Sequence, residues 1–458
     1  MADHSNTHEH ALEYILPARR LTGTRAEVLD QIDEVIQGLV GLRQLITLRQ
    51  PASPERVPKA QLHLVRALCV VWALVGAAAP AEAQLAAAPA PAAAADEPAA
   101  ETGEASNPFE QIKFGATFEG YYQYDWNRPP DRVLLLRAYD TRTNVLGIQQ
   151  VAVVVDAAPD PGAGRRFGLR ADLQFGQATE TVQGSPANEP RPDVYRHVWQ
   201  AFGSYVFPVG RGLQTDFGKF ASMLGYETNY AKDNQAFSRA YLFNFLPFYH
   251  SGLRVGIPVS DEVTVLYMLS NGIQQTEDFN DFKSSHVAAI VRPVPSLAWT
   301  INWYFGQEQP DGGQPGGPDG WFRVFDTYVT FAATPALTFG LDVNYVTNEV
   351  NASDPSLSLQ GTAAYARYQV RPATAFGVRY EYLDDEGLFG GIDQALQEVT
   401  VTAEYKLADG FIVRGEYRRD WSNEPFFTGP GGADDLRTYQ NTALIGVIWV
   451  VGNKVGAW

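Results

Sequence analysis

Apolar and polar residues alternate with a period of two through the last three-quarters of the chain. Leu337, Phe339 and Leu341, for example, alternate with Thr338 and Gly340. This is the period of a β-strand, whose successive side chains point to opposite faces of a sheet. The pattern predicts sixteen strands, at 112–125, 145–156, 166–177, 196–207, 213–221, 249–257, 263–271, 285–292, 297–306, 321–332, 336–347, 359–370, 374–384, 396–406, 410–420 and 438–451.

The connections between these strands alternate in length. Short connections fall at 208–212, 258–262, 293–296, 333–335, 371–373 and 408–409. Long connections fall at 126–144, 178–195, 222–248, 272–284, 307–320, 348–358, 385–395 and 421–437, and 157–165 is intermediate. Short periplasmic turns and long extracellular loops are typical of an outer-membrane β-barrel, so we predict an all-β, transmembrane antiparallel barrel over 108–458 with both ends periplasmic.

The chemistry of the two strand faces supports a membrane location. Lipid offers no hydrogen bonds, so a spanning sheet must close on itself. One face carries Leu, Val, Phe, Trp and Tyr, and the other Gly, Thr, Asn, Gln and charged residues, as expected for a lipid-facing wall around a wet lumen. A soluble sandwich or jelly roll is the alternative, and a split or merged hairpin would change the count to fourteen or eighteen strands.

The N-terminal region has the pattern of a targeting sequence rather than of a folded domain. Basic residues in 59–66, an apolar run in 67–79 and the small residues around Ala83 are typical of a secretory signal peptide at 59–83, cleaved after Ala83. Because a signal peptide normally starts a chain, we interpret 1–58 as an upstream extension that is not translated, with the true start near Val57. Residues 84–107, rich in Ala and Pro, are predicted to be a disordered linker.

Composition narrows the function further. The net charge is −17, which disfavours a nucleic-acid partner. The single cysteine, Cys69, lies in the predicted signal peptide, so the mature chain would have no disulfide or thiolate metal site. The last residue, Trp458, resembles the terminal aromatic by which barrel-assembly machinery recognises its clients, although 452–458 does not continue the strand pattern.

A motif-level resemblance points to one family. The segments 218–227, 233–243 (DNQAFSRAYLF) and 246–254 (LPFYHSGLR) resemble the β-barrel porin-2 (OmpL-like) family. A related order, Gly-Lys-Phe, an acidic loop and then Ser-Arg, also resembles phosphate-type porins. The resemblance implies a passive channel in the bacterial outer membrane, surrounded by lipid and lipopolysaccharide, for small hydrophilic solutes or ions. Trimers are common at this barrel size, so a homotrimer is a further expectation.

The longest connection, 222–248, is the candidate for a loop that folds inward and narrows the pore. Charges of both signs on this loop and on the flanking strands would set a field across the passage and orient dipolar solutes. The candidate constriction residues are Lys219, Glu227, Lys232, Asp233, Arg239 and Arg254. The alternative is that they are ordinary solvated loop charges and strand-end pairs.

The alternation also assigns charges to the lumen side of the wall. The predicted inward bases are Lys113, Arg170, Arg367, Arg379, Lys406, Arg414 and Arg418, and the predicted inward acids are Glu119, Asp172, Asp342, Glu381, Glu398, Glu404 and Glu416. Seven against seven is balanced, which predicts weak ion selectivity.

Catalysis, cofactors and metals are not predicted. Beyond the signal peptide the histidines are His197, His250 and His286. His250 is adjacent to Ser251, so the two point to opposite faces of a strand and cannot form a dyad. The remaining alternatives to a general porin are a substrate-specific channel and a non-conducting binding or adhesion barrel.

Overall fold

The computed structural model describes residues 112–183, 189, 191–309, 319–454 and 456–458. The predicted upstream extension, signal peptide and linker lie outside the described residues. Among the described residues, no helix has the length and apolar character needed to cross a bilayer.

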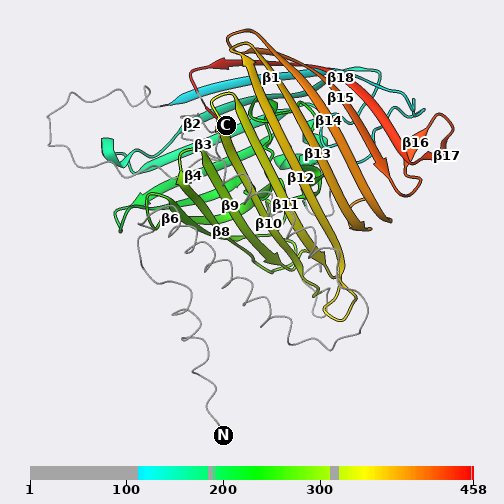
Figure 1. Cartoon of the computed structure of the whole chain (residues 1–458). Coiled ribbons are helices and arrows are strands. Elements are labelled where there is room, and N and C mark those ends of the chain that lie inside the picture. The colour runs from blue at the N-terminus through cyan, green and yellow to red at the C-terminus, as the bar shows by residue number, and fades with distance from the viewer. Residues whose placement is uncertain (1–111, 184–188, 190, 310–318, 455) are drawn as a thin grey trace, which may run out of the picture. The chain divides into compact units, whose positions relative to one another are not determined.

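The described chain forms one closed antiparallel barrel of sixteen strands, as predicted (Figure 1). Each strand pairs with its neighbours in sequence, and the barrel closes where the first strand pairs with the last, Gly115 opposite Gly452. The strands are β1 (Lys113–Asp125), β2 (Leu146–Ala157), β3 (Phe167–Phe175), β4 (Val198–Phe207), β5 (Leu213–Ala221), β6 (Tyr249–Pro258), β7 (Val263–Ser270), β8 (Ser284–Val294), β9 (Leu297–Gly306), β10 (Phe322–Thr334), β11 (Leu337–Asn348), β12 (Leu357–Arg371), β13 (Thr374–Glu386), β14 (Asp393–Ala408), β15 (Phe411–Ser422) and β18 (Tyr439–Gly452).

The long extracellular loops contain short elements that the alternation did not reveal. A two-stranded hairpin, β16 (Phe427–Gly429) and β17 (Gly432–Arg437), lies in the loop before β18. Helical turns in these loops are α4 (Ala178–Gln183), α5 (Pro192–Tyr195), α6 (Tyr241–Phe245) and η3 (Ala231–Asp233). One further turn, η2 (Pro161–Ala163), lies in the connection between β2 and β3 on the periplasmic side. Elements of three to six residues are too short to show a helical or strand period in sequence.

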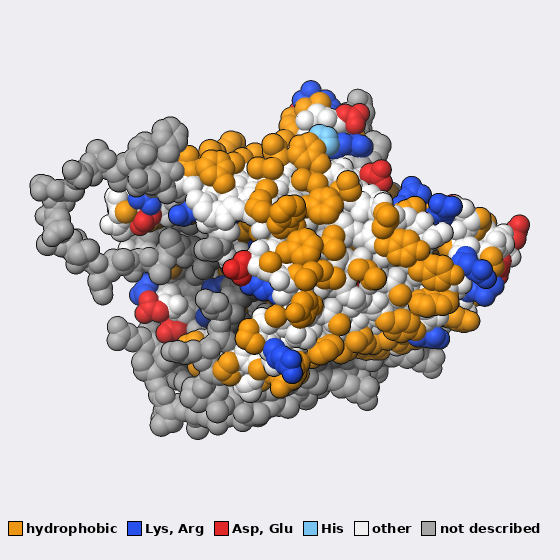
Figure 2. Space-filling model, turned by 90° about the horizontal axis from the view of Figure 1, so that it is seen from above, with side chains coloured by type: hydrophobic (Ala, Val, Ile, Leu, Met, Phe, Trp, Pro, Cys, Tyr) orange, Lys and Arg blue, Asp and Glu red, His pale blue; other side chains and the backbone are white. Residues whose placement is uncertain are grey.

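The outer wall is apolar, which fits a barrel in lipid. Large hydrophobic side chains are exposed along the strands, and Figure 2 shows them spread over the described wall. Examples are Phe167, Phe217, Ile445 and Trp449. A soluble protein rarely exposes so extended an apolar surface, whereas hydrocarbon solvates it without cost.

The inner face differs from the prediction of a polar, wet lumen. Near the extracellular ends of the strands it is apolar and buried, with a cluster that includes Val324, Val346, Leu359, Leu383 and Leu396. These positions share a face with inward charges, as the alternation requires. They are buried because a long loop packs inside the barrel against them.

Candidate pore constriction

Residues 222–248, here called the lumen loop, connect β5 to β6 and lie inside the barrel. The contacts of this connection show that it folds inward, as predicted. Its backbone and side chains bond to inward residues of β1, β3, β10, β11, β13 and β15. A loop that meets strands on opposite sides of a barrel crosses the lumen.

Wall carboxylates hold the loop by accepting its backbone N–H groups. The wall acceptors are the carboxylates of Glu119, Asp326, Asp342, Glu381 and Glu416. Glu381 accepts from two successive amides, Tyr241 and Leu242, at 2.7 Å each. Charge-assisted bonds of this kind are stronger than neutral ones. The inward acids therefore replace the backbone partners that a loop buried in a barrel would otherwise lack.

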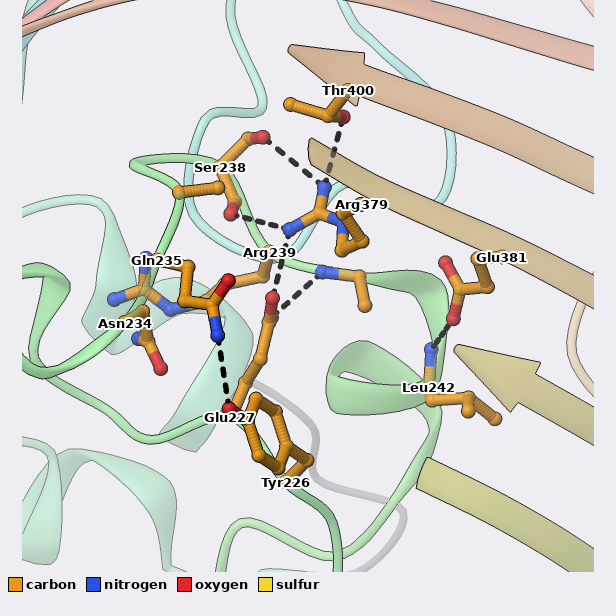
Figure 3. A network of polar contacts seen from close by, with 12 residues as sticks. Tyr226, Glu227, Asn234, Gln235, Ser238, Arg239, Leu242, Arg379, Glu381 and Thr400 are labelled. Atoms are coloured by element: carbon orange, nitrogen blue, oxygen red, sulfur yellow. Dashed lines mark hydrogen bonds and ion pairs between the residues drawn. The ribbon is translucent and has the colours of Figure 1, made fainter. Parts of the chain in front are cut away.

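Wall arginines complete the anchoring by donating to loop oxygens. Arg379 bonds Glu227 of the loop at 2.8 Å and the Ser238 carbonyl at 2.9 Å (Figure 3). It also bonds Glu398 of the wall at 2.5 Å. Arg414 donates to the carbonyls of Ala231 and Ala236, and Arg418 to that of Arg239. The predicted lumen charges thus mostly bind the loop.

Glycines on the inward face let large side chains touch the wall backbone. A Cβ added to Gly340, Gly361 or Gly446 would collide with Tyr226, Leu242 or Phe237 of the lumen loop, respectively. These three glycines lie on different strands, so the loop fits the wall by shape as well as by charge. The sequence suggested only that small residues face the lumen.

A cavity of about 560 Å³ lies on the periplasmic side of the loop. Its lining comes from the loop itself and from strand ends near the short turns, such as Asp156, Arg292 and Thr338. The cavity carries charges of both signs. Its basic residues are Arg170, Lys232, Arg254, Arg292, Arg367, Arg414 and Lys454, and its acidic residues are Asp156, Asp216, Glu227, Asp233 and Glu404.

The six candidate constriction residues occupy different places. Glu227, Lys232, Asp233 and Arg254 line the cavity. Arg239 is buried within the loop, where it donates to the carbonyls of Thr228, Asn229 and Phe237. Lys219 is also buried, with its ammonium 3.8 Å from the centre of the Tyr249 ring.

The electrostatics of the four cavity residues follow from their partners. Arg254 pairs with Asp216 at 2.8 Å, and Lys232 with its neighbour Asp233 at 2.8 Å. Burial lowers the pKa of the Lys232 ammonium below its ordinary value, and the Asp233 carboxylate opposes this effect. The Lys232 ammonium therefore loses its charge at a pH below the ordinary pKa of lysine.

Some of the other predicted lumen charges pair with each other, and two face solvent. Arg170 makes a bidentate ion pair with Asp172. Glu404 pairs with both Arg367 and Arg414, at 2.7 Å each. Lys113 and Lys406 are exposed at the periplasmic ends of their strands.

Sequence reasoning missed a second loop that enters the lumen. Residues 126–145 carry Arg137, which pairs with Asp420 at 3.1 Å, and Tyr139, which donates to Asn229 of the lumen loop at 2.7 Å. Both side chains are buried. Its length gave no signal, because the connection between β3 and β4 is longer.

Trp458 lies inside the barrel, and its role as a terminal assembly signal stays a prediction. Strand β18 ends at Gly452, and Trp458 turns inward against Gly115 and the ring of Tyr230. Lys232 lies 4.5 Å above its indole. Trp449, near the end of β18, is exposed on the outer wall.

Comparisons with known proteins agree with this architecture. A family model described as "Putative beta-barrel porin-2, OmpL-like" matches residues 111–449. An anion-selective porin from Comamonas acidovorans is similar at 9% identity, with a TM-score of 0.50 over 74% of this chain and 99% of that one. The outer-membrane channel DcaP of Acinetobacter baumannii is similar at 9% identity and a TM-score of 0.48, over 74% and 97%. No curated protein matches the chain.

Proposed function

The chain belongs to the β-barrel porin-2 (OmpL-like) family and is a porin of the bacterial outer membrane, and we propose that its lumen loop is the constriction that limits passage. The observation that carries this proposal is the anchoring of residues 222–248 across the lumen. Buried charges on β1, β13 and β15 hold the loop from several sides. A segment held in this way narrows the passage at a fixed depth.

The charges that line the cavity on the periplasmic side of the loop favour small hydrophilic solutes as the transported class. Its walls hold seven basic and five acidic side chains, most of them paired with each other. Paired charges present both donors and acceptors without a strong field of one sign. We therefore expect polar neutral solutes and small ions to pass, with a weak preference for anions.

Single-channel conductance of the full chain in a planar bilayer tests the proposal. We expect stepwise openings whose current rises linearly with salt concentration. Saturable block by one sugar or anion would identify a substrate-specific channel instead. A folded, heat-modifiable barrel that never conducts would contradict the porin assignment and favour a binding or adhesion role.

Strand length supports a homotrimer as the assembled state. β3, β5 and β7 have 9, 9 and 8 residues, whereas β12 and β14 have 15 and 16. At about 3.3 Å per residue and a tilt of about 40°, the short strands span roughly 20 Å, less than the apolar band of about 25 Å. We propose that this short side faces other copies of the chain rather than lipid.

Cross-linking in native membranes tests the assembly. In a chain that also carries Cys69→Ser, a cysteine replacing Ala201, which is exposed on β4, should cross-link neighbouring copies into covalent dimers, the largest product that one cysteine per copy can form, and the native complex should migrate as a trimer. Cysteines replacing the exposed Ala364 on β12 are the matched control and should stay monomeric. Equal cross-linking at both positions would contradict this orientation.

A further inference from the structure

The two methionines that follow residue 111 and two of the three histidines there converge on one small cavity. Met223 of the lumen loop, His250 on β6, Met268 on β7 and His286 on β8 all line it. We propose that these four side chains form a binding site for a soft monovalent metal cation, Cu⁺ or Ag⁺. The site does not depend on whether the barrel conducts.

The hydrogen bonds of His250 fix its tautomer. Its Nδ1 lies 3.2 Å from the carbonyl oxygen of Gly272, which can only accept, so Nδ1 carries the proton. Nε2 therefore keeps its lone pair. That nitrogen lies 3.2 Å from the Ser222 hydroxyl, which donates to it. A metal ion would replace this single weak donor.

A chain of bonds fixes His286 in the same way. The Asn302 amide nitrogen donates to the Met223 carbonyl at 3.2 Å and to the Asp326 carboxylate at 2.6 Å, so its Oδ1 faces His286. Nε2 of His286 lies 3.0 Å from that oxygen and must donate to it. Nδ1 is then the nitrogen with the lone pair. Histidines that bind metals typically donate their other N–H to such an oxygen.

The dimensions fit one ion. The two imidazole centres are 6.5 Å apart, and two metal–nitrogen bonds of about 2 Å each would occupy most of that separation. The cavity measures about 10 Å³, close to the space needed by one water molecule. It shares Ala221, Met223, Arg254 and Leu266 with the large periplasmic cavity, which gives an entry path.

The donor set selects the class of ion. Thioethers and neutral imidazoles are soft or intermediate ligands, which favour Cu⁺ over hard cations. All four donors are uncharged, and the nearby Arg254 pairs with Asp216 at 2.8 Å. A monovalent ion therefore fits better than a divalent one, because Coulomb repulsion from a neighbouring cation grows with ionic charge.

Silver ion is the probe, because it avoids the redox chemistry of copper. The test uses the full chain with Cys69→Ser in detergent and nitrate buffer, with Ag⁺ measured after equilibrium dialysis. Met268→Leu and His286→Gln are the site variants, since Met and Leu have similar volumes. His197→Gln is the matched control, because His197 stacks on Phe175 and does not line the cavity.

We expect the parent chain and the His197→Gln control to bind one more Ag⁺ than either site variant, with affinity falling by about tenfold or more in the variants. Heat-modifiable migration confirms that each variant is folded. Equal binding by the parent and Met268→Leu would overturn the site. Equal affinity for Zn²⁺ and Ag⁺ at the extra site would overturn the assignment to a soft monovalent ion.

Discussion

The two halves of the lumen are built from the same alternating strands, yet they differ in what fills them. The extracellular half is packed: Leu242 and the wall residues Leu359 and Leu383 are fully buried together. The periplasmic half contains the cavity of about 560 Å³, lined by polar side chains such as Ser204 and Thr338. The lumen loop separates them.

This difference shows that inward position does not mean contact with water. The same alternation places Glu381 and Arg367 inside the barrel. Glu381 is fully buried against loop amides, whereas Arg367 lines the cavity. The role of an inward charge therefore depends on which loop residue, if any, lies opposite it.

Removal of Arg379 should produce the largest change. Arg379→Gln leaves Glu227 and Glu398 buried without their shared cation, and breaking a buried ion pair costs about 3–5 kcal/mol. We expect the loop to leave the wall and single-channel conductance to rise. Arg419→Gln, on the exposed side of the same barrel, is the control and should change neither conductance nor stability. Unchanged conductance in Arg379→Gln would mean that the lumen loop is not the constriction.

A methyl group on the wall should produce a smaller change. In Gly446→Ala the new Cβ collides with the Phe237 ring, and overpacking of this kind costs about 1–3 kcal/mol. We expect amides of the lumen loop to exchange hydrogen faster in mass spectrometry. Gly415→Ala adds the same methyl where nothing lies within 4 Å, so its exchange should match that of the parent. Equal exchange in both variants would mean that the loop does not rest on the wall.

The smallest expected effect is a pH dependence of ion preference. Burial lowers the pKa of Lys232. As the pH rises through that lowered pKa, the ammonium loses its charge and the cavity loses one positive charge. The weak preference for anions should therefore decline at a pH below the ordinary pKa of lysine, as measured by reversal potential in a salt gradient. Lys232→Met should remove this step, and a step that persists would assign it to another group.

The sequence predicted the barrel well because strand alternation and loop length are local signals. All sixteen strands appear, with ends that differ by a few residues. The lumen loop was also found, through its length. Two contacts could not be predicted: the pairing of Arg379 with Glu227, 152 residues apart in sequence, and the packing of the Phe237 ring against Gly446. Such contacts depend on how a loop without a period folds back inside the closed barrel.

The position of Trp458 shows the same limit. Its aromatic character suggested an assembly signal, which stays a prediction. The contacts of Trp458 with Gly115, Lys232 and Tyr230 in the folded barrel were not foreseen. None of these contacts leaves a pattern in the local sequence.

The most direct test of the packed and open halves is cysteine accessibility. Ala298 on β9 lines the cavity, and Ala363 on β12 is fully buried in the packed half. Each is replaced by cysteine in a chain with Cys69→Ser, and the folded barrel is treated with a charged methanethiosulfonate reagent. We predict that Ala298→Cys reacts about a hundredfold faster than Ala363→Cys, because the packed half must open first, at a cost of about 3 kcal/mol. Equal rates would contradict a lumen divided by the loop.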